Sequence, residues 1–107
     1  MFECRPAQPE DYPMISAFPR NEEELFYMFP TASYPLTADQ IEANSNQRQH
    51  PTVVVRDDGE VAGYANLYGY EEGDKCWLGN VIISPECRGI GAAEALILHM
   101  FSYARDE

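Results

Sequence analysis

The stretch ISPECRGIGAAEAL, residues 83–96, holds two glycines, an arginine and several small residues where an apolar segment gives way to a helical one. A loop that leaves a strand and opens a helix can bind an anion, because unpaired backbone amides and the helix dipole add there. Arg88 adds a positive charge. Small residues leave room for a ligand close to the main chain, here Gly89, Gly91, Ala92 and Ala93. The stretch therefore predicts a phosphate site, preferably for a diphosphate that spans several amides.

Two common phosphate-binding motifs do not fit this turn. A Walker A loop needs GK[ST] at the start of its helix, whereas AAEA follows Gly91. A dinucleotide-binding fold needs a third glycine and a later strand with an acidic residue, whereas Glu94 occurs here and no later strand is predicted. The alternative that the glycines only turn a strand into a helix remains open.

The rest of the chain predicts a mixed α/β (α+β) domain in the order β-α-α-(α)-β-β-β-α. Asn21 can cap a helix whose three glutamates indicate a solvated helix start, and Thr37 with Gln40 forms a capping box for the next helix. Gly59 lies in the turn of a predicted hairpin. The predicted strands cover residues 2–6, 52–56, 61–70 and 76–84, and the predicted helices cover residues 9–18, 22–29, 37–47 and 91–105.

Side-chain patterns predict how these elements pack. Alternation in the second hairpin strand places Tyr64, Asn66, Tyr68 and Tyr70 on one face, which we expect to border a cleft or water, and Val61, Ala65 and Leu67 on the other. The apolar run 81–83 predicts a central strand that is buried on both faces. The last helix has an apolar stripe for packing on the sheet: Ala93, Leu96, Ile97, Met100, Phe101 and Ala104.

Composition narrows the class of protein. The 107 residues predict one packed domain, residues 1–107, and 45% of them are hydrophobic. The formal net charge of −11 would repel nucleic acid and anionic membranes and attract small cations such as amines. We expect no nucleic-acid partner and no membrane association. No run of transmembrane length and no leader pattern is seen, so we expect a cytoplasmic protein.

The cysteines and histidines offer no recognisable metal or redox motif. Cys4, Cys76 and Cys87 are odd in number and lack CxxC spacing, which argues against a disulfide framework and a zinc knuckle. His50 and His99 lie far apart in sequence without a ligand-spaced partner. We expect no metal.

The segment RGIGAA resembles the Arg/Gln-x-x-Gly-x-Gly/Ala signature of GNAT-family N-acyltransferases, with Arg88, Gly91 and Ala93 at the defining positions. Its context is similar too, because a Pro-containing turn precedes it and a helix follows it. The N-terminal segment 2–15 also looks like the family's first strand and helix. The resemblance covers nearly the whole chain and implies the GNAT fold.

The resemblance implies acetyl-CoA as co-substrate, no metal, and direct attack of a primary amine on the thioester. The acceptor would be a small or peptidic amine, held on the side of the helices in residues 21–47. Main-chain groups of three strand residues would contact the pantetheine arm: Val81, Ile82 and Ile83. Backbone amides of the turn would surround the pyrophosphate: Gly89, Ile90, Gly91, Ala92, Ala93 and Glu94.

The positions just ahead of the apolar triplet differ from the pattern of the family. Many family members carry a carboxylate just ahead of the apolar triplet, whereas this chain has Gly79 and Asn80 there. We take Asn80 and Asn66 as the candidate catalytic residues, because an amide can orient a water or a substrate amine. Glu71 is the nearest carboxylate at a strand end. The family's tyrosine acid would follow Glu107.

By this resemblance the chain is C-terminally truncated, because family members add a further strand, a helix and a closing strand pair. The apolar strand would then be an open edge, and we expect either a homodimer that covers it or a truncated form that binds CoA poorly. The alternative function is a non-catalytic acyl-CoA-binding or dimerisation module with the same fold.

Overall fold

A computed structural model describes residues 2–68, 77–89 and 91–106. Its element order is the predicted one, with two short 3-10 turns added. The strands are β1 (Glu3–Pro6), β2 (Gln49–Val55), β3 (Val61–Tyr68) and β4 (Trp77–Ile83). The helices are α1 (Tyr12–Ile15), α2 (Glu22–Met28), α3 (Ala38–Ser45) and α4 (Ala92–Asp106), and the 3-10 turns are η1 (Pro9–Asp11) and η2 (Pro85–Cys87).

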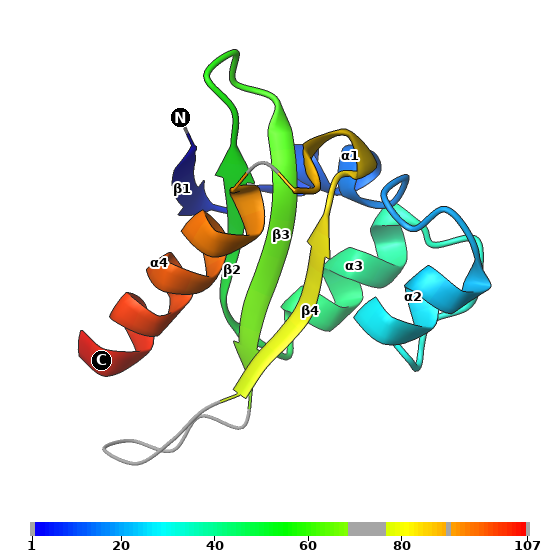
Figure 1. Ribbon diagram of the computed structural model, residues 1–107. Coiled ribbons are helices and arrows are strands. Elements are labelled where there is room, and N and C mark those ends of the chain that lie inside the picture. The colour runs from blue at the N-terminus through cyan, green and yellow to red at the C-terminus, as the bar shows by residue number, and fades with distance from the viewer. Residues whose placement is uncertain (1, 69–76, 90, 107) are drawn as a thin grey trace.

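The four strands form one antiparallel sheet in the order β1-β2-β3-β4 (Figure 1). The long helix α4 covers one face, while α1 packs against β3 and α3 on the other face, and α2 contacts β4. Within the described residues β4 is the outermost strand, with β3 as its neighbour. The prediction of a central strand from its apolar end is therefore wrong for this sheet. The apolar sequence of this strand reflects its burial beneath helices and does not require a neighbouring strand on each edge.

Each face of the sheet has its own core. The face with the short helices buries a cluster of Tyr12, Ile15, Phe18, Leu25, Met28, Phe29, Leu36, Ile41, Val53, Val61, Tyr64 and Ile82. The α4 face buries Val54, Ala62, Ala65, Leu67, Ile83, Cys87, Ala92, Leu96 and Met100. The stripe predicted for the last helix is correct at Leu96 and Met100 but wrong at Phe101, which is 59% exposed. The buried line of α4 runs at intervals of four residues through Ala92, so Phe101 lies outside it.

A bulge in β3 alters the predicted faces of the hairpin. Val54 pairs with Gly63 and Val55 with Val61, so Ala62 is an extra residue in the ladder. The bulge reverses the alternation, which brings Val61 into the cluster of Tyr64. The prediction of a wet tyrosine face is wrong at Tyr64, which is 1% exposed because the short helices cover it, and also at Asn66, which is fully buried. Tyr68 is exposed, and residue 70 lies outside the described residues.

The helix starts behave largely as predicted. The Asn21 side chain accepts a hydrogen bond from the Glu24 N–H, and the Thr37 side chain accepts one from the Gln40 N–H. The second half of the capping box is absent, because Oε1 of Gln40 accepts the Ser33 N–H instead. The helix that begins after Thr37 ends at Ser45, two residues earlier than expected.

The structure also places the cysteines and histidines. Cys4 and Cys87 are free thiols, and Cys76 lies outside the described residues. Although far apart in sequence, His50 and His99 meet, with 3.3 Å between their Nε2 atoms. The described part of the chain contains no group of three or more metal-ligating side chains. None of its helices has the length and apolar character needed to span a membrane.

Candidate functional site

The predicted phosphate turn lies between the end of β4 and the start of α4. The Ser84 N–H bonds the Ala62 carbonyl at 2.7 Å, which holds the turn against β3. Gly89 has φ 83° and Gly91 has φ 97°. An added Cβ would meet no atom within 4 Å at Gly89 and only the edge of Phe2 at 4.0 Å at Gly91. Glycine is therefore required here by the backbone conformation rather than by crowding.

This turn surrounds a hollow of about 230 Å³. Its lining consists of Ile83, Cys87, Arg88, Gly89, Gly91, Ala93 and Glu94. Four of these residues are among the six that the sequence assigned to the pyrophosphate: Gly89, Gly91, Ala93 and Glu94. Ala92 is buried beneath it in the α4 core, and Ile90 lies outside the described residues. The structure thus brings the motif residues together around one open space.

The start of α4 offers unpaired backbone donors beside this hollow. The first helical hydrogen bond runs from the Ala95 N–H to the Gly91 carbonyl. The N–H groups of Ala92, Ala93 and Glu94 precede any intrahelical acceptor, as in the first turn of every α-helix. Since α4 has 15 residues, its dipole also favours a negative charge at this end.

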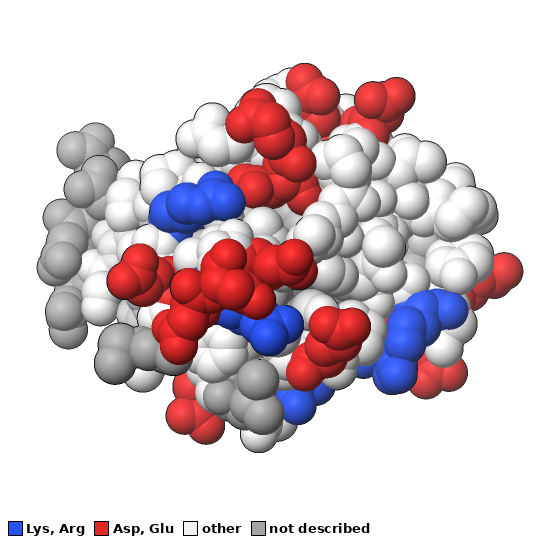
Figure 2. All heavy atoms as spheres, turned by 90° about the horizontal axis from the view of Figure 1, so that it is seen from above, with Lys and Arg blue, Asp and Glu red and all other residues white. Residues whose placement is uncertain are grey.

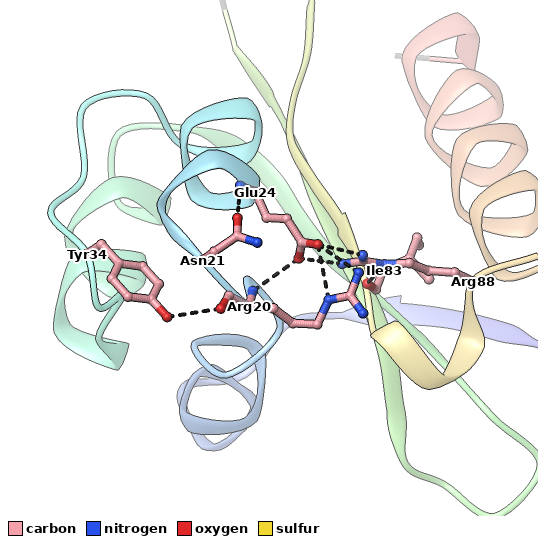
Figure 3. A network of polar contacts seen from close by, with 6 residues as sticks. All are labelled: Arg20, Asn21, Glu24, Tyr34, Ile83 and Arg88. Atoms are coloured by element: carbon pink, nitrogen blue, oxygen red, sulfur yellow. Dashed lines mark hydrogen bonds and ion pairs between the residues drawn. The ribbon is translucent and has the colours of Figure 1, made fainter.

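Arg88 of this turn is bonded to both β4 and α2. Its Nε donates to the Ile83 carbonyl at 3.0 Å, and its Nη1 and Nη2 donate to the two carboxylate oxygens of Glu24 at 3.2 Å each. Arg20 also bonds Glu24 through its side chain and its backbone N–H. Figure 3 shows the Glu24 carboxylate joined by dashed lines to the guanidinium groups of both Arg20 and Arg88. One carboxylate is therefore shared by two arginines.

This environment favours the charged form of Glu24. The hydrogen bonds from Arg88 contribute most, those from Arg20 follow, and together they lower the pKa of Glu24 to about 2. The ion pairs therefore persist across the pH range in which ordinary carboxylates titrate. The surface seen from above the view of Figure 1 carries many acidic side chains, with basic side chains among them (Figure 2).

The outer edge of β4 presents main-chain groups next to the hollow. The Ser84 N–H points to β3, and successive residues of a strand point their N–H and C=O groups to opposite sides. The N–H and C=O of Ile83 therefore face the outer edge, where Arg88 already occupies the carbonyl. By the same alternation, the main-chain groups of Ile82 point toward β3. The Val81 side chain packs partly buried on the α4 core.

The two candidate catalytic amides are brought together inside the protein. Asn66 Nδ2 donates to Oδ1 of Asn80 at 2.9 Å and to the Tyr64 hydroxyl at 3.0 Å. Asn80 also accepts from Asn44 Nδ2 at 2.6 Å and donates to the Met28 carbonyl at 2.8 Å. Asn66 is fully buried and Asn80 is 8% exposed.

The side-chain amides of Asn44, Asn66 and Asn80 form one hydrogen-bond network with the Tyr64 hydroxyl. Burial raises the pKa of Tyr64 to about 12, so its phenol is a neutral partner at physiological pH. Glu71, the nearest candidate carboxylate in sequence, lies outside the described residues.

Sequence reasoning missed Glu24 and Asn44 as members of these networks. Glu24 belongs to a run of three glutamates that reads as a solvated helix start, and it lies 64 residues from Arg88. Asn44 lies 36 residues from Asn80. Neither contact has a local sequence signal, because both depend on how the helices pack against β4.

Comparisons with known proteins identify the family of this chain. The sequence model described as the Acetyltransferase (GNAT) family matches residues 12–107. No curated protein matches the chain at a significant level.

Solved structures share the fold. A GCN5-related N-acetyltransferase from Kribbella flavida has 28% identity and a TM-score of 0.69, over 98% of this chain and 66% of its own. N-acetylglutamate synthase from Neisseria gonorrhoeae, complexed with coenzyme A and N-acetyl-glutamate, has 24% identity and a TM-score of 0.74, over 99% of this chain and 23% of its own. The ribosomal-protein-S18-alanine N-acetyltransferase from Escherichia coli has 17% identity and a TM-score of 0.68, over 99% of this chain and 61% of its own.

This chain therefore spans less than two thirds of the length of each of these three proteins. The part of their fold that is shared nevertheless extends over 98–99% of this chain, and the family match covers all but its first eleven residues. The strand, glycine turn and helix of the family signature surround one hollow. This chain belongs to the GNAT acetyltransferase family.

Proposed function

We propose that this protein binds acetyl-CoA at the turn between β4 and α4 and transfers the acetyl group to a primary amine. The observation that carries the proposal is the hollow lined by the signature residues, at a helix start with unpaired amides. The N-acetylglutamate synthase that shares the fold was solved with coenzyme A bound. Family membership supports the same class of ligand for this chain.

In this proposal the diphosphate of the cofactor lies against the backbone amides of residues 89–94. The pantetheine arm follows the outer edge of β4, where Ile83, and Val81 two residues earlier, can offer main-chain groups. The Ile83 carbonyl is already bonded to Arg88, so its N–H is the group left for the cofactor. No metal is required for this binding mode.

The proposed reaction is a direct transfer. The nitrogen of a neutral amine attacks the thioester carbonyl carbon, the C–S bond breaks, and the thiolate of CoA leaves and takes up a proton. The amide nitrogen of the product loses one proton to a base. Asn80 and Asn66 remain the candidate site residues, and the hydrogen bond between them favours a role in holding β4 in shape over a role as proton carriers.

The acceptor is proposed as a small or peptidic amine of cationic character, because the net charge of −11 attracts cations. The fold alone selects no acceptor, since proteins that share it are named for glutamate and for the alanine of a ribosomal protein. We also propose a cytoplasmic location and a homodimer across the outer edge of β4, which sedimentation velocity would test.

The buried, hydrogen-bonded state of the Asn66 and Asn80 side chains favours a second candidate function. Both amides are engaged with protein partners, and no acid or base has been assigned among the described residues. A domain that binds acyl-CoA without transferring its acyl group would have the same cofactor turn. The two functions differ in turnover, not in cofactor binding.

The test is an acetyl-transfer assay that detects released CoA thiol and confirms each product by mass spectrometry. The protein is incubated with acetyl-CoA and a panel of polyamines, amino acids and peptides. We expect thiol release that depends on one class of amine and is lost in Gly91→Glu. Cofactor binding without transfer to any amine would favour the binding module, and absence of both would contradict the proposal.

A further inference from the structure

Helix α2 is tied to the β4 region at both of its ends. Near its start, the Glu24 carboxylate bonds Arg88 of the cofactor turn. At its other end, the Met28 carbonyl accepts a hydrogen bond from Asn80 in β4. By the family resemblance, α2 lies on the acceptor side of the site. The Glu24–Arg88 pair is therefore a direct connection between the acceptor side and the cofactor side (Figure 3).

Glu24 places a negative charge beside the proposed diphosphate site, although the two arginines that it bonds are positive. Glu24 carries a full negative charge because its pKa is lowered to about 2. By simple electrostatics, a carboxylate this close to the turn should repel a diphosphate. If Glu24 nevertheless increases the affinity for the cofactor, it must act through something other than its charge.

The geometry of Arg88 suggests that contribution. Its guanidinium bonds the Ile83 carbonyl through Nε and Glu24 through both Nη atoms, so its orientation is fixed by a strand end and a helix. Arg88 immediately precedes the glycines that must keep positive φ angles. Removal of Glu24 would leave the guanidinium with one partner and allow the turn and α2 to move separately.

We infer that Glu24 is a positioning residue that holds α2 and the diphosphate turn in one arrangement, so that cofactor binding and the placement of the acceptor-side helix are coupled. This inference rests on the proposed function, because the ligand of the turn is taken to be acetyl-CoA. Reciprocity follows: cofactor that orders the turn must also order α2.

The first test is calorimetric titration of acetyl-CoA into the wild type, Glu24→Gln and Glu24→Asp. Gln removes the charge, and Asp keeps the charge but shortens the reach. Positioning predicts weaker binding in both variants, by about fivefold. Charge repulsion alone predicts tighter binding for Gln and no change for Asp, and that result would overturn the inference.

Glu23→Gln is the matched control. Glu23 lies in the same helical turn, is exposed, and makes no ion pair within the described residues. The control removes the same charge from the protein and should leave the affinity for acetyl-CoA nearly unchanged. A loss equal to that of Glu24→Gln would assign the effect to net charge or helix stability and would count against positioning.

Amide hydrogen exchange distinguishes coupling from a purely structural role of Glu24, because a purely structural role would not change the protection of α2 by the ligand. We expect acetyl-CoA to slow amide exchange in residues 22–28 of the wild type and of Glu23→Gln, but much less in Glu24→Gln at saturating ligand. Equal protection in all three would overturn the coupling while leaving the cofactor site intact. A folded wild type that does not bind acetyl-CoA would instead refute the proposed function, and with it this inference.

Discussion

The side-chain amide of Asn66 donates to the Oδ1 atom of Asn80 at 2.9 Å, inside the protein and across a bulge in β4. The bulge arises because Tyr64 pairs with Ile82 and Asn66 with Gly79, so that one β3 residue faces two β4 residues. Asn80 has φ 54°, a conformation that asparagine tolerates better than most residues. The amide network thus stabilises an irregular strand at the edge proposed for the cofactor.

Asn80→Ala should destabilise the protein by about 3 kcal/mol. The variant loses both bonds of Oδ1 and leaves the buried Met28 carbonyl without its Asn80 donor, and alanine is disfavoured at this positive φ. Urea unfolding followed by circular dichroism measures the loss. Asn46→Ala, at the exposed end of α3, should change stability little. Equal stability of Asn80→Ala and the wild type would mean that the network does not hold the bulge.

Acid should weaken the fold through Asp11. The hydrogen-bonded side chain of Arg5 is the main cause that lowers the pKa of Asp11 below its ordinary value, and the Gln8 N–H adds to it. The carboxylate therefore contributes stability at pH values above its ordinary range near 4, and this contribution is lost as pH falls through the lower folded-state pKa.

The measurement for Asp11 is a comparison of unfolding free energies at pH 7 and in acid. Asp11→Asn should cost about 1–2 kcal/mol at pH 7, and the difference from the wild type should shrink toward acid. Asp39→Asn, in the first turn of α3, serves as the control because it removes a carboxylate elsewhere. A constant difference at all pH values would contradict this assignment.

Tyr64 should produce the opposite dependence in alkali. Its folded-state pKa is raised to about 12 by burial, whereas an unfolded tyrosine titrates near 10. The stability that depends on the neutral phenol is fully present below pH 10 and is lost as pH rises toward 12, by about 2–3 kcal/mol. Tyr64→Phe should flatten this alkaline slope. Tyr27→Phe, at a side chain that is 78% exposed, should retain the wild-type slope.

Much of the fold could be predicted because its signals are local. The helix caps at Asn21 and Thr37 join residues three positions apart, and the turn between β2 and β3 contains Gly59. The phosphate turn was also predictable, since its glycines and the following helix are contiguous in sequence. These features depend on backbone propensities that a short window of sequence contains.

The remaining features depend on packing between distant segments. The Ala62 bulge changes which face Val61 joins, and alternation alone cannot show an extra residue. Asn80 meets Asn44 of α3 and Arg88 meets Glu24 of α2 because the helices lie against β4. The amides that looked like site residues in sequence are buried partners of one another, which only the three-dimensional structure reveals.

Gly89 in the turn between β4 and α4 can be tested against a matched glycine elsewhere in the protein. Gly89 has φ 83° and Gly59, in the β2–β3 hairpin, has φ 86°, and an added Cβ would meet no atom within 4 Å at either. Alanine should therefore destabilise both by a similar amount, about 1–2 kcal/mol. Only Gly89→Ala should also weaken acetyl-CoA binding. Equal binding by the two variants would place the ligand elsewhere.

The most direct test of the account is calorimetric titration of acetyl-CoA into the wild type, Gly91→Glu and Gly59→Glu. Both variants add one carboxylate at a glycine of positive φ, but only Gly91 lines the hollow. The account predicts saturable binding to the wild type and Gly59→Glu, and none to Gly91→Glu. A folded wild type that does not bind, or a Gly91→Glu variant that binds as well as the wild type, would contradict a cofactor site at this turn.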